Sequence, residues 1–307
     1  MAVFSGVHAA LLTAFDADGA LDTRATAALA TDLIDRGVHG LVVNGSTGEF
    51  ASLSTEERRL NLETVIAAVG DRTQVTAQVG AMTTADATAS TEHALKAGAV
   101  AGMLVCPYYE AIDEREVEDY FRTVAEVGLP LMIYNNPSAT GWSMRPEFIA
   151  KLATIDGVRF LKDTTPEVGR LFRIRQLCGD SIEILSGQDS VALAGFLAGG
   201  ARATVWGAVN AVPEACVRLW ELAVLDRDAE RAREFWQHLY PLTHFFETHG
   251  YAQAVKTATN LRGVEVGVPR LPALPVEESD IDELRRVLAL ANQAVARFDR
   301  APATQSA

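Results

Sequence analysis

The unit from which this chain is built shows most clearly between residues 157 and 165, which read Gly157-Val158-Arg159-Phe160-Leu161-Lys162-Asp163-Thr164-Thr165. This short apolar run has the length of a strand, begins after a glycine and ends in polar residues. Side chains of a strand alternate between its two faces, so Val158, Phe160 and Lys162 are expected to share one face. The sequence therefore predicts a strand whose apolar stripe is continued by the amine of Lys162.

Lys162 is one of only four lysines in the chain, against twenty-three arginines. An arginine keeps its proton in proteins, whereas a lysine amine can lose its proton and attack a ketone carbon to form a Schiff base. The presence of lysine at this position therefore indicates imine chemistry. A salt bridge at the end of the strand is the alternative interpretation.

Similar apolar runs recur eight times, with helical patterns between them. The runs cover Val7–Phe15, Gly40–Gly45, Gln74–Val79, Gly102–Cys106, Leu131–Asn135, Val158–Lys162, Ile182–Ser186 and Ala203–Trp206. Ser54-Thr55-Glu56-Glu57 forms a capping box ahead of one helical pattern. Eight strand–helix units in about 210 residues predict an α/β fold, a (β/α)8 TIM barrel. A doubly wound sheet is the alternative, but the glycine-rich turn typical after its first strand is missing from the sequence.

Three further helical stretches follow the eighth run. Residues 212–249 are predicted to be helical with a kink at Pro241, and helices over 252–262 and 280–298 come next. The last helix carries an apolar stripe, which packs on the barrel or its neighbouring helices, or else forms a subunit interface. We therefore expect a barrel over residues 1–225, a C-terminal helical extension over 226–300 and a disordered tail over 301–307.

The composition argues against several classes of function. A formal net charge of −13 is unfavourable for binding nucleic acids or anionic membranes, which requires clustered lysines and arginines. The three cysteines, Cys106, Cys178 and Cys216, are widely spaced, and the histidines lack the spacing of metal ligands. The sequence shows no signal peptide and no apolar stretch of membrane-spanning length. It therefore predicts a cytoplasmic protein without a metal site.

The predicted strands end in polar residues, and active sites of such barrels lie at the C-terminal ends of the strands. These ends read Gly45-Ser46-Thr47-Gly48-Glu49, Pro107-Tyr108-Tyr109, Tyr134-Asn135-Asn136-Pro137, Lys162-Asp163 and Ser186-Gly187-Gln188-Asp189, with Thr204 and Trp206 on the last strand. Hydroxyl and backbone N–H groups of the first turn are suited to bind a carboxylate, although a plain tight turn is the alternative. Tyr134 lies one strand before Lys162, so its hydroxyl is expected near the amine or else in the core.

Together these motifs resemble the dihydrodipicolinate synthase / N-acetylneuraminate lyase family of class I aldolases, over nearly the whole chain. The resemblance implies a lyase that needs neither a cofactor nor a metal, in which Lys162 forms a Schiff base with pyruvate or another 2-oxo acid. It implies that Tyr134 shuttles protons at the bound substrate. It also implies that Ser46 and Thr47 bind the substrate carboxylate and join the proton relay.

The same resemblance extends to the edge of the pocket and to the assembly. It implies that Gly187 and Thr204 line the pocket. It implies a homotetramer built from tight dimers, in which Tyr109 reaches into the site of a neighbouring subunit.

Two departures from the family limit the substrate. Dihydrodipicolinate synthases carry an arginine two residues after the proline of their Tyr-Asn-x-Pro segment, and here that residue is Ala139, whose methyl group cannot bind a carboxylate as a guanidinium does. Sialic acid lyases read sugar hydroxyls with an acidic pair after the glycine of strand seven, and here Asp189 is followed by Ser190. We therefore expect Asp189, Ser190 and Thr140 to contact the hydroxyls of a different substrate.

The sequence thus predicts a Schiff-base-forming lyase that acts on pyruvate or a hydroxylated 2-oxo acid, with retro-aldol release of pyruvate, or condensation, as the first interpretation. Dehydration of a 2-keto-3-deoxy sugar acid is an alternative that uses the same imine. 4-Hydroxy-tetrahydrodipicolinate synthase activity is disfavoured by Ala139. A non-catalytic sensor of 2-oxo acids is the alternative from another class, because a fold alone does not establish a function.

Overall fold

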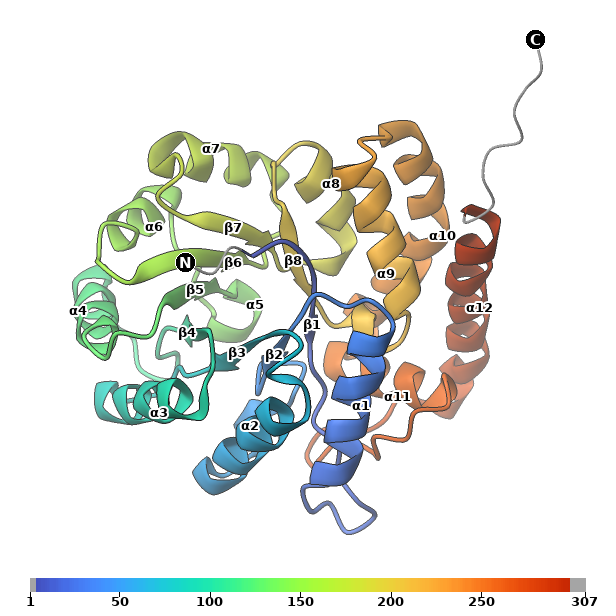
Figure 1. Ribbon diagram of the computed structural model, residues 1–307, viewed down its shortest axis with the longest axis horizontal. Coiled ribbons are helices and arrows are strands. Elements are labelled where there is room, and N and C mark those ends of the chain that lie inside the picture. Colours follow the sequence, from blue (N-terminus) through green and yellow to red (C-terminus); the bar gives the residue numbers. More distant parts are fainter. Residues whose placement is uncertain (1–3, 299–307) are drawn as a thin grey trace.

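The computed structural model describes residues 4–298 and has a closed barrel of eight parallel strands, in which each strand pairs with the next and β8 pairs with β1 (Figure 1). This confirms the predicted (β/α)8 barrel. The strands are β1 (Gly6–Ala10), β2 (Gly40–Val43), β3 (Gln74–Gln78), β4 (Ala101–Val105), β5 (Leu131–Asn135), β6 (Val158–Asp163), β7 (Glu183–Ser186) and β8 (Ala203–Trp206).

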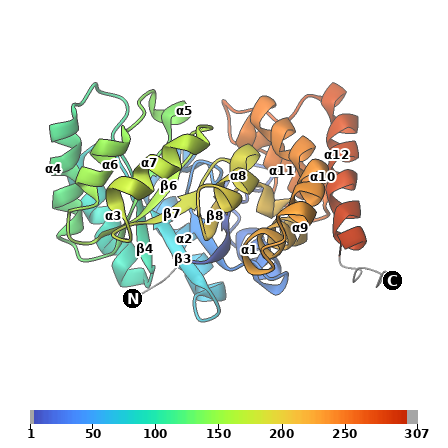
Figure 2. The same cartoon turned by 90° about the horizontal axis from the view of Figure 1, so that it is seen from above.

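Helices connect these strands on the outside of the barrel, except for the short α5, which lies at the rim with the cavity, and α9, which follows the last strand (Figures 1 and 2). They are α1 (Thr23–Asp35), α2 (Thr55–Val69), α3 (Thr84–Ala97), α4 (Glu114–Ala125), α5 (Pro137–Thr140), α6 (Pro146–Leu152), α7 (Val168–Cys178), α8 (Ala192–Leu197) and α9 (Pro213–Trp220). The predicted capping box is present at α2, where Ser54 and Glu57 each accept the other's backbone N–H. The short α5 lies between β5 and α6, directly after the strand that carries Tyr134.

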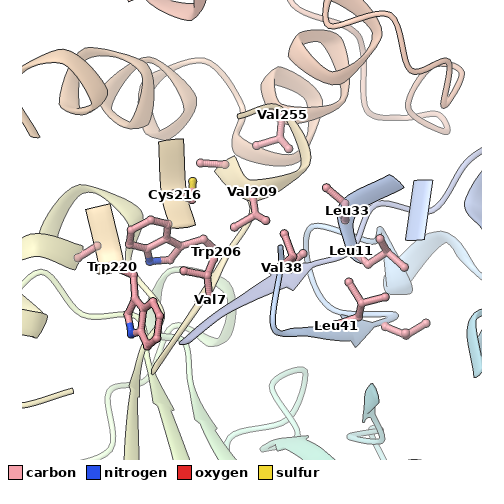
Figure 3. Close-up of a cluster of buried hydrophobic side chains, with 14 of the residues drawn as sticks. Val7, Leu11, Leu33, Val38, Leu41, Trp206, Val209, Cys216, Trp220 and Val255 are labelled. Carbon is pink, nitrogen blue, oxygen red and sulfur yellow. The ribbon is translucent and has the colours of Figure 1, made fainter. Parts of the chain in front are cut away.

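The buried side chains form two layers, one inside the barrel and one between the strands and the helices. The outer layer is shown in Figure 3, where Trp206 of β8, Val7 of β1 and Leu41 of β2 face residues of the surrounding helices. The inner layer includes Met103, Met132, Tyr134, Phe160, Leu185 and Val205. Side chains that point inward at the C-terminal ends of the strands therefore stand on a packed apolar floor.

The alternation expected for β6 is broken at its start. Val158 packs in the outer layer, whereas Phe160 packs in the inner layer. The register explains this, because Leu131 pairs with Val158 while the next residue of β5, Met132, pairs with Phe160, so β6 holds one extra residue. The prediction that Val158 shares the face of Lys162 was wrong, while Phe160 and Lys162 do share it.

The first strand is shorter than the predicted run Val7–Phe15, because β1 ends at Ala10. Beyond it, the backbone N–H groups of Leu12 and Ala14 donate to the side chains of Asn210 and Thr26 rather than to a neighbouring strand. Leu11 still donates its backbone N–H to the carbonyl of Val42 in β2, and the apolar residues from Leu12 on form a buried connection outside the sheet.

Residues 212–249 form two helices instead of the predicted single one. A π-helical turn, Glu221–Leu225, follows α9, and Arg227 has a positive φ of 55° before Asp228 caps α10 (Ala229–Thr248). The helix α10 continues through Pro241. A residue with positive φ cannot continue an α-helix, so the break falls at Arg227.

The last helices, α11 (Tyr251–Leu261) and α12 (Ile281–Phe298), lie with α10 on one side of the barrel (Figures 1 and 2). The apolar stripe of α12 is buried at Leu284, Leu288, Ala291 and Phe298, and α12 packs mainly against α10. This agrees with the interpretation that the stripe packs on neighbouring helices. The division at residues 225 and 226 stays a prediction, and the predicted tail 301–307 lies outside the described residues.

Candidate active site

A cavity of about 490 Å³ lies at the C-terminal ends of the barrel strands. Its lining joins the ends of β2, β5, β6, β7 and β8 with residues of α10 and α11. The lining residues are Ala10, Ser46, Thr47, Tyr134, Asn136, Pro137, Ser138, Ala139, Lys162, Thr164, Pro166, Gly187, Gln188, Asp189, Val205, Gly207, Glu247 and Tyr251. Most of the side chains expected at the site therefore meet in one cavity.

Lys162 extends from the end of β6 into this cavity and is only 4% exposed. Its Nζ lies 4.4 Å from the centre of the Tyr134 ring. The neighbouring β7 approaches closely, since a Cβ added to Gly187 would lie 2.8 Å from Cγ of Lys162. Gly187 therefore leaves the room that the aliphatic part of Lys162 occupies.

Asp163, the residue after Lys162, points to the other side of the strand, as expected from alternation. Its carboxylate accepts hydrogen bonds from Nε of Arg170 at 2.9 Å and from the backbone N–H of Thr165 at 2.9 Å. Asn135 also donates to it, at 3.4 Å. This buried ion pair joins the end of β6 to α7 and takes the Asp163 charge away from the amine.

Ser46 and Thr47 lie in the turn that follows β2, and both line the cavity. The turn is held by Thr13, whose hydroxyl donates to the carbonyl of Gly48 at 2.7 Å. A Cβ at Gly48 would lie 2.8 Å from the carbonyl oxygen of Leu11, so a glycine is needed there. The turn thus presents two hydroxyls in a fixed position at the cavity that holds Lys162.

The hydroxyl of Tyr134 has two polar neighbours. Asn136 donates from Nδ2 to the Tyr134 oxygen at 2.8 Å, and the Ser46 hydroxyl lies 3.4 Å away. Asn136 is itself oriented, because the hydroxyl of Ser138 donates to its Oδ1 at 2.8 Å. The Thr164 hydroxyl lies 3.2 Å from the same oxygen, and its proton has a closer acceptor in the Asn135 carbonyl at 2.8 Å. With one lone pair of Tyr134 occupied by Asn136, its own proton is free to point toward Ser46 or a bound substrate.

Two carboxylates line another part of the cavity. Asp189 is buried and accepts the backbone N–H of Ala208 at 3.1 Å, and Tyr251 also hydrogen-bonds to it. Burial raises the pKa of Asp189 to about 6, against the effect of these two hydrogen bonds, and the charge of Glu247 adds to the rise. Burial and Asp189 also raise the pKa of Tyr251 well above its usual value, so Tyr251 is the donor in this pair.

The structure does not bring four of the expected residues to this cavity, and Ser190, which follows Asp189, is the first of them. Thr204 points to the outer side of β8 and donates to the carbonyl of Ser186 at 2.7 Å, while its neighbour Val205 lines the cavity. Thr140 faces an adjoining cavity of about 220 Å³ and donates to backbone carbonyls of its own loop. Tyr109 is 84% exposed and lines a separate surface cavity.

Sequence reasoning missed several residues of the cavity. Asn136 follows the end of the strand that carries Tyr134, but its position in the motif assigns it no role. Glu247 and Tyr251 belong to the C-terminal helices, at least 58 positions after Asp189 by their residue numbers, and no local motif marks them. Only the packing of α10 and α11 against the barrel places them at the cavity.

The described part of the chain also bears on membrane and metal binding. None of the helices within 4–298 is long and apolar enough to cross a membrane. Across the same residues, no group of three or more His, Cys, Asp or Glu side chains is arranged to hold a metal ion.

Comparison with known proteins agrees with this geometry. A model of the Dihydrodipicolinate synthetase family matches residues 3–291. The chain belongs to this family. It is 36% identical, over 93% of its length and 96% of the relative's, to a protein of Methanothrix thermoacetophila named 4-hydroxy-tetrahydrodipicolinate synthase.

Solved structures of the family superpose closely on this barrel. The 4-hydroxy-tetrahydrodipicolinate synthase of Methylacidiphilum fumariolicum SolV matches with a TM-score of 0.91 and 28% identity, over 97% of this chain and 99% of the other. The E. coli K12 prophage protein YagE, solved in complex with pyruvate, matches with a TM-score of 0.89 and 30% identity, over 95% and 99%. As a member of this family, the chain is a lyase of the class I aldolase type that acts on pyruvate through a lysine Schiff base.

Proposed function

We propose that the protein cleaves a hydroxylated 2-oxo acid by a retro-aldol reaction and releases pyruvate, with Lys162 as the imine-forming residue. The observation that carries this proposal is the placement of Lys162 beside the hydroxyls of Tyr134, Ser46 and Thr47 in one cavity. These groups supply an amine for the ketone carbon, a proton carrier and a cradle for the 2-oxo acid carboxylate.

The reaction starts when the neutral amine of Lys162 attacks the ketone carbon and water leaves, giving a protonated imine. The C3–C4 bond then breaks, and its electron pair moves toward the imine to form an enamine. The hydroxyl on C4 loses its proton and becomes an aldehyde, which departs. Protonation of the enamine at C3 and addition of water to the imine release pyruvate and restore Lys162.

Tyr134 is the proposed proton carrier for these steps. Its oxygen accepts from Asn136 and lies 3.4 Å from Ser46, so it can pass a proton between a substrate atom and the Ser46–Thr47 turn. The hydroxyls of Ser46 and Thr47 hold the carboxylate, which orients the ketone carbon toward the amine. Asp189 is proposed to accept hydrogen bonds from substrate hydroxyls.

Three expected site residues have indirect or conditional roles in this proposal. Thr140 would reach the substrate only if the tail of the substrate extends into the adjoining cavity. Thr204 would act by holding Ser186 and Gly187 in place through its hydrogen bond to the Ser186 carbonyl. Tyr109 is proposed to serve the site of another subunit.

4-Hydroxy-tetrahydrodipicolinate synthase is the second candidate function, favoured by the names of the relatives. It condenses pyruvate with an aldehyde that carries a carboxylate. Ala139 stands where the family resemblance expects the arginine for that carboxylate, and Lys162 is the only lysine or arginine among the residues that line the cavity. Dehydration of a 2-keto-3-deoxy sugar acid is a further candidate, because it uses the same imine.

Borohydride reduction in the presence of pyruvate tests the proposal. We expect a stable pyruvate adduct that mass spectrometry places on Lys162, and no adduct in Lys162→Arg, which keeps the charge but cannot form the imine. Lys151→Arg is the matched control, because Lys151 is exposed and paired with Glu118. An adduct on Lys96, Lys151 or Lys256 instead would refute the assignment.

Turnover separates the candidate activities. We expect pyruvate release from hydroxylated 2-oxo acids to exceed both their dehydration and the condensation of pyruvate with aspartate semialdehyde. An adduct on Lys162 without pyruvate release from any of these substrates would contradict the retro-aldol proposal.

We also propose a homotetramer in the cytoplasm. The exposed Tyr109, Met82 and neighbouring residues form a surface cavity that suits a subunit contact, and the three cysteines are free, as in a reducing compartment. Light scattering of the purified protein tests the assembly, and a monomer that keeps full activity would contradict a role for Tyr109 across subunits.

A further inference from the structure

The cavity has an acidic wall, formed by Asp189 after β7 and Glu247 near the end of α10. Lys162 is the only lysine or arginine among the residues that line the cavity, so two carboxylates face one amine. The adjoining cavity has no lysine or arginine in its lining, and its one carboxylate, Glu49, is balanced by an ion pair with Lys256. The space beyond Lys162 therefore carries negative charge.

Both carboxylates of the acidic wall are fixed by neighbours. The backbone N–H of Ser190 donates to Oε1 of Glu247 at 3.0 Å, and Asp189 is held by Ala208 and Tyr251. Within residues 4–298, no hydrogen bond or ion pair engages Oε2 of Glu247, which leaves this oxygen free to accept from a bound molecule. The wall is thus oriented and still has acceptor capacity.

The carboxylate of the bound substrate balances the one positive charge of the cavity. In the proposed reaction, the protonated imine of Lys162 lies beside the 2-oxo acid carboxylate, which the hydroxyls of Ser46 and Thr47 also bind. A second anionic group at the far end of the substrate would find no cation there and would face two carboxylates. Like charges in a partly buried site repel, whereas hydroxyl groups can donate hydrogen bonds to the same carboxylates.

We propose that the acidic wall selects substrates whose tail is uncharged and hydroxylated, and that Glu247 is a specificity-determining residue that rejects tails ending in a carboxylate or phosphate. This inference rests on the proposed function and deepens it by naming the class of the substrate tail. Glu247 comes from the C-terminal helices, so the tail is read by a segment that supplies none of the imine chemistry.

Competitive borohydride trapping tests this proposal without requiring turnover. Three 2-oxo acids of six carbons are mixed at equal concentrations: 2-keto-3-deoxygluconate with a hydroxylated tail, 2-oxohexanoate with an apolar tail and 2-oxoadipate with a carboxylate tail. Mass spectrometry measures the amount of each adduct on Lys162. Cleavage of the hydroxylated acid leaves pyruvate bound to Lys162, so the pyruvate adduct is added to the amount measured for the hydroxylated acid. We expect the hydroxylated acid to exceed 2-oxoadipate at least about tenfold, with 2-oxohexanoate between them.

The variant Glu247→Gln keeps the shape of the side chain and removes its charge. It should lower the ratio of the hydroxylated adduct to the 2-oxoadipate adduct about tenfold, because the tail carboxylate of 2-oxoadipate is then no longer repelled by the negative charge of Glu247. Asp71→Asn is the matched control, since Asp71 is an exposed carboxylate before β3, at the opposite end of the barrel, and should leave the ratio unchanged.

Each failure points to a different conclusion. Equal trapping of 2-oxoadipate by the native protein, or an unchanged ratio in Glu247→Gln, would overturn the role of Glu247 while leaving the imine intact. A preference for 2-oxohexanoate would overturn the hydroxylated class. If pyruvate alone gives no adduct on Lys162, the proposed function fails and this inference fails with it.

Discussion

Asn136 is the residue whose contribution is least visible in the sequence and most specific in the structure. Its Nδ2 donates to the Tyr134 hydroxyl at 2.8 Å, and the Ser138 hydroxyl donates to its own oxygen at 2.8 Å and so orients the amide. A residue that directs the proton of Tyr134 should influence proton transfer more than imine formation. Asn136 is therefore a positioning residue for the proposed relay.

Replacing Asn136 with valine should separate these two steps. We expect Asn136→Val to lower the exchange of pyruvate methyl protons in D2O about tenfold, since one hydrogen bond of about 1–1.5 kcal/mol is lost. Proton NMR measures the exchange, and borohydride trapping shows whether the Lys162 adduct still forms. Ser138→Ala is the comparison, because it removes a donor to Oδ1 of Asn136 but keeps the amide that donates to Tyr134, and its effect should stay below about threefold. Unchanged exchange in Asn136→Val would remove Asn136 from the relay.

The site residues that could be predicted are those at strand ends next to a recognisable motif. Lys162, Tyr134, Ser46 and Thr47 reach the cavity because parallel strands of a barrel end on one rim. Thr204 does not reach it, because strand alternation gives the inward position to its neighbour Val205. Which of two adjacent residues faces inward depends on the register of the barrel, and the sequence of β8 alone does not contain that information.

At the scale of single elements, the turn after β2 depends on a helix that is distant in the sequence. Glu49, at the end of this turn, has a positive φ of 57° and forms a buried ion pair with Lys256 of α11, with 2.5 Å between Nζ and Oε1. The centre of the Phe15 ring lies 4.2 Å from the Nζ of Lys256. No sequence pattern predicts this pair, because its partners are more than two hundred positions apart.

Removing one partner of this pair should be costly. We expect Lys256→Met to lower the free energy of unfolding by about 3–5 kcal/mol, because it leaves the Glu49 carboxylate buried without its cation. The double variant Lys256→Met with Glu49→Gln should recover part of this loss. Urea unfolding of the single and double variants measures both. A cost below about 1 kcal/mol for Lys256→Met would show that Glu49 finds water or another partner.

The capping box at Ser54 and the helical patterns over 252–262 and 280–298 predict the start of α2 and the bounds of α11 and α12 to within a few residues. The failures have local causes that periodicity does not contain. The extra residue in β6 shifts Val158 to the outer layer, and the positive φ of Arg227 ends the helix that was expected to run through residue 249. Both depend on backbone geometry at a single residue.

At the scale of the whole molecule, the stability of the barrel depends on pH through His8. His8 is fully buried inside the barrel, and burial, together with the nearby His39, lowers its pKa from 6.5 to about 4. As the pH falls, the imidazole of His8 is protonated in the unfolded chain before it is protonated in the folded protein. The free energy of unfolding is therefore unaffected by His8 above pH 6.5 and decreases as the pH falls from 6.5 toward 4. Asp189 acts in the opposite direction, because its pKa is raised from 3.8 to about 6 in the folded protein. The folded state therefore binds a proton at Asp189 before the unfolded chain does, which increases the free energy of unfolding as the pH falls from about 6 to 3.8.

A variant without the His8 imidazole should lose part of this acid sensitivity. We expect the free energy of unfolding of His8→Gln to fall less than that of the native protein between about pH 7 and pH 4, by about 3 kcal/mol. Urea unfolding at several pH values measures the difference, and His244→Gln, at an exposed site on α10, is the control. Parallel pH curves for His8→Gln and the native protein would contradict the prediction.

The position of α10 and α11 beside the barrel has a consequence for how this protein could diversify. In the proposed reaction, imine formation depends on the ends of β2, β5 and β6, whereas Glu247 and Tyr251 come from a late segment of the chain. Mutation or recombination within that segment can change which molecules are accepted while the reaction itself is preserved. To change the substrate preference by engineering, a library of variants would therefore begin at residues 247–251 and keep the residues at the ends of β2, β5 and β6 unchanged.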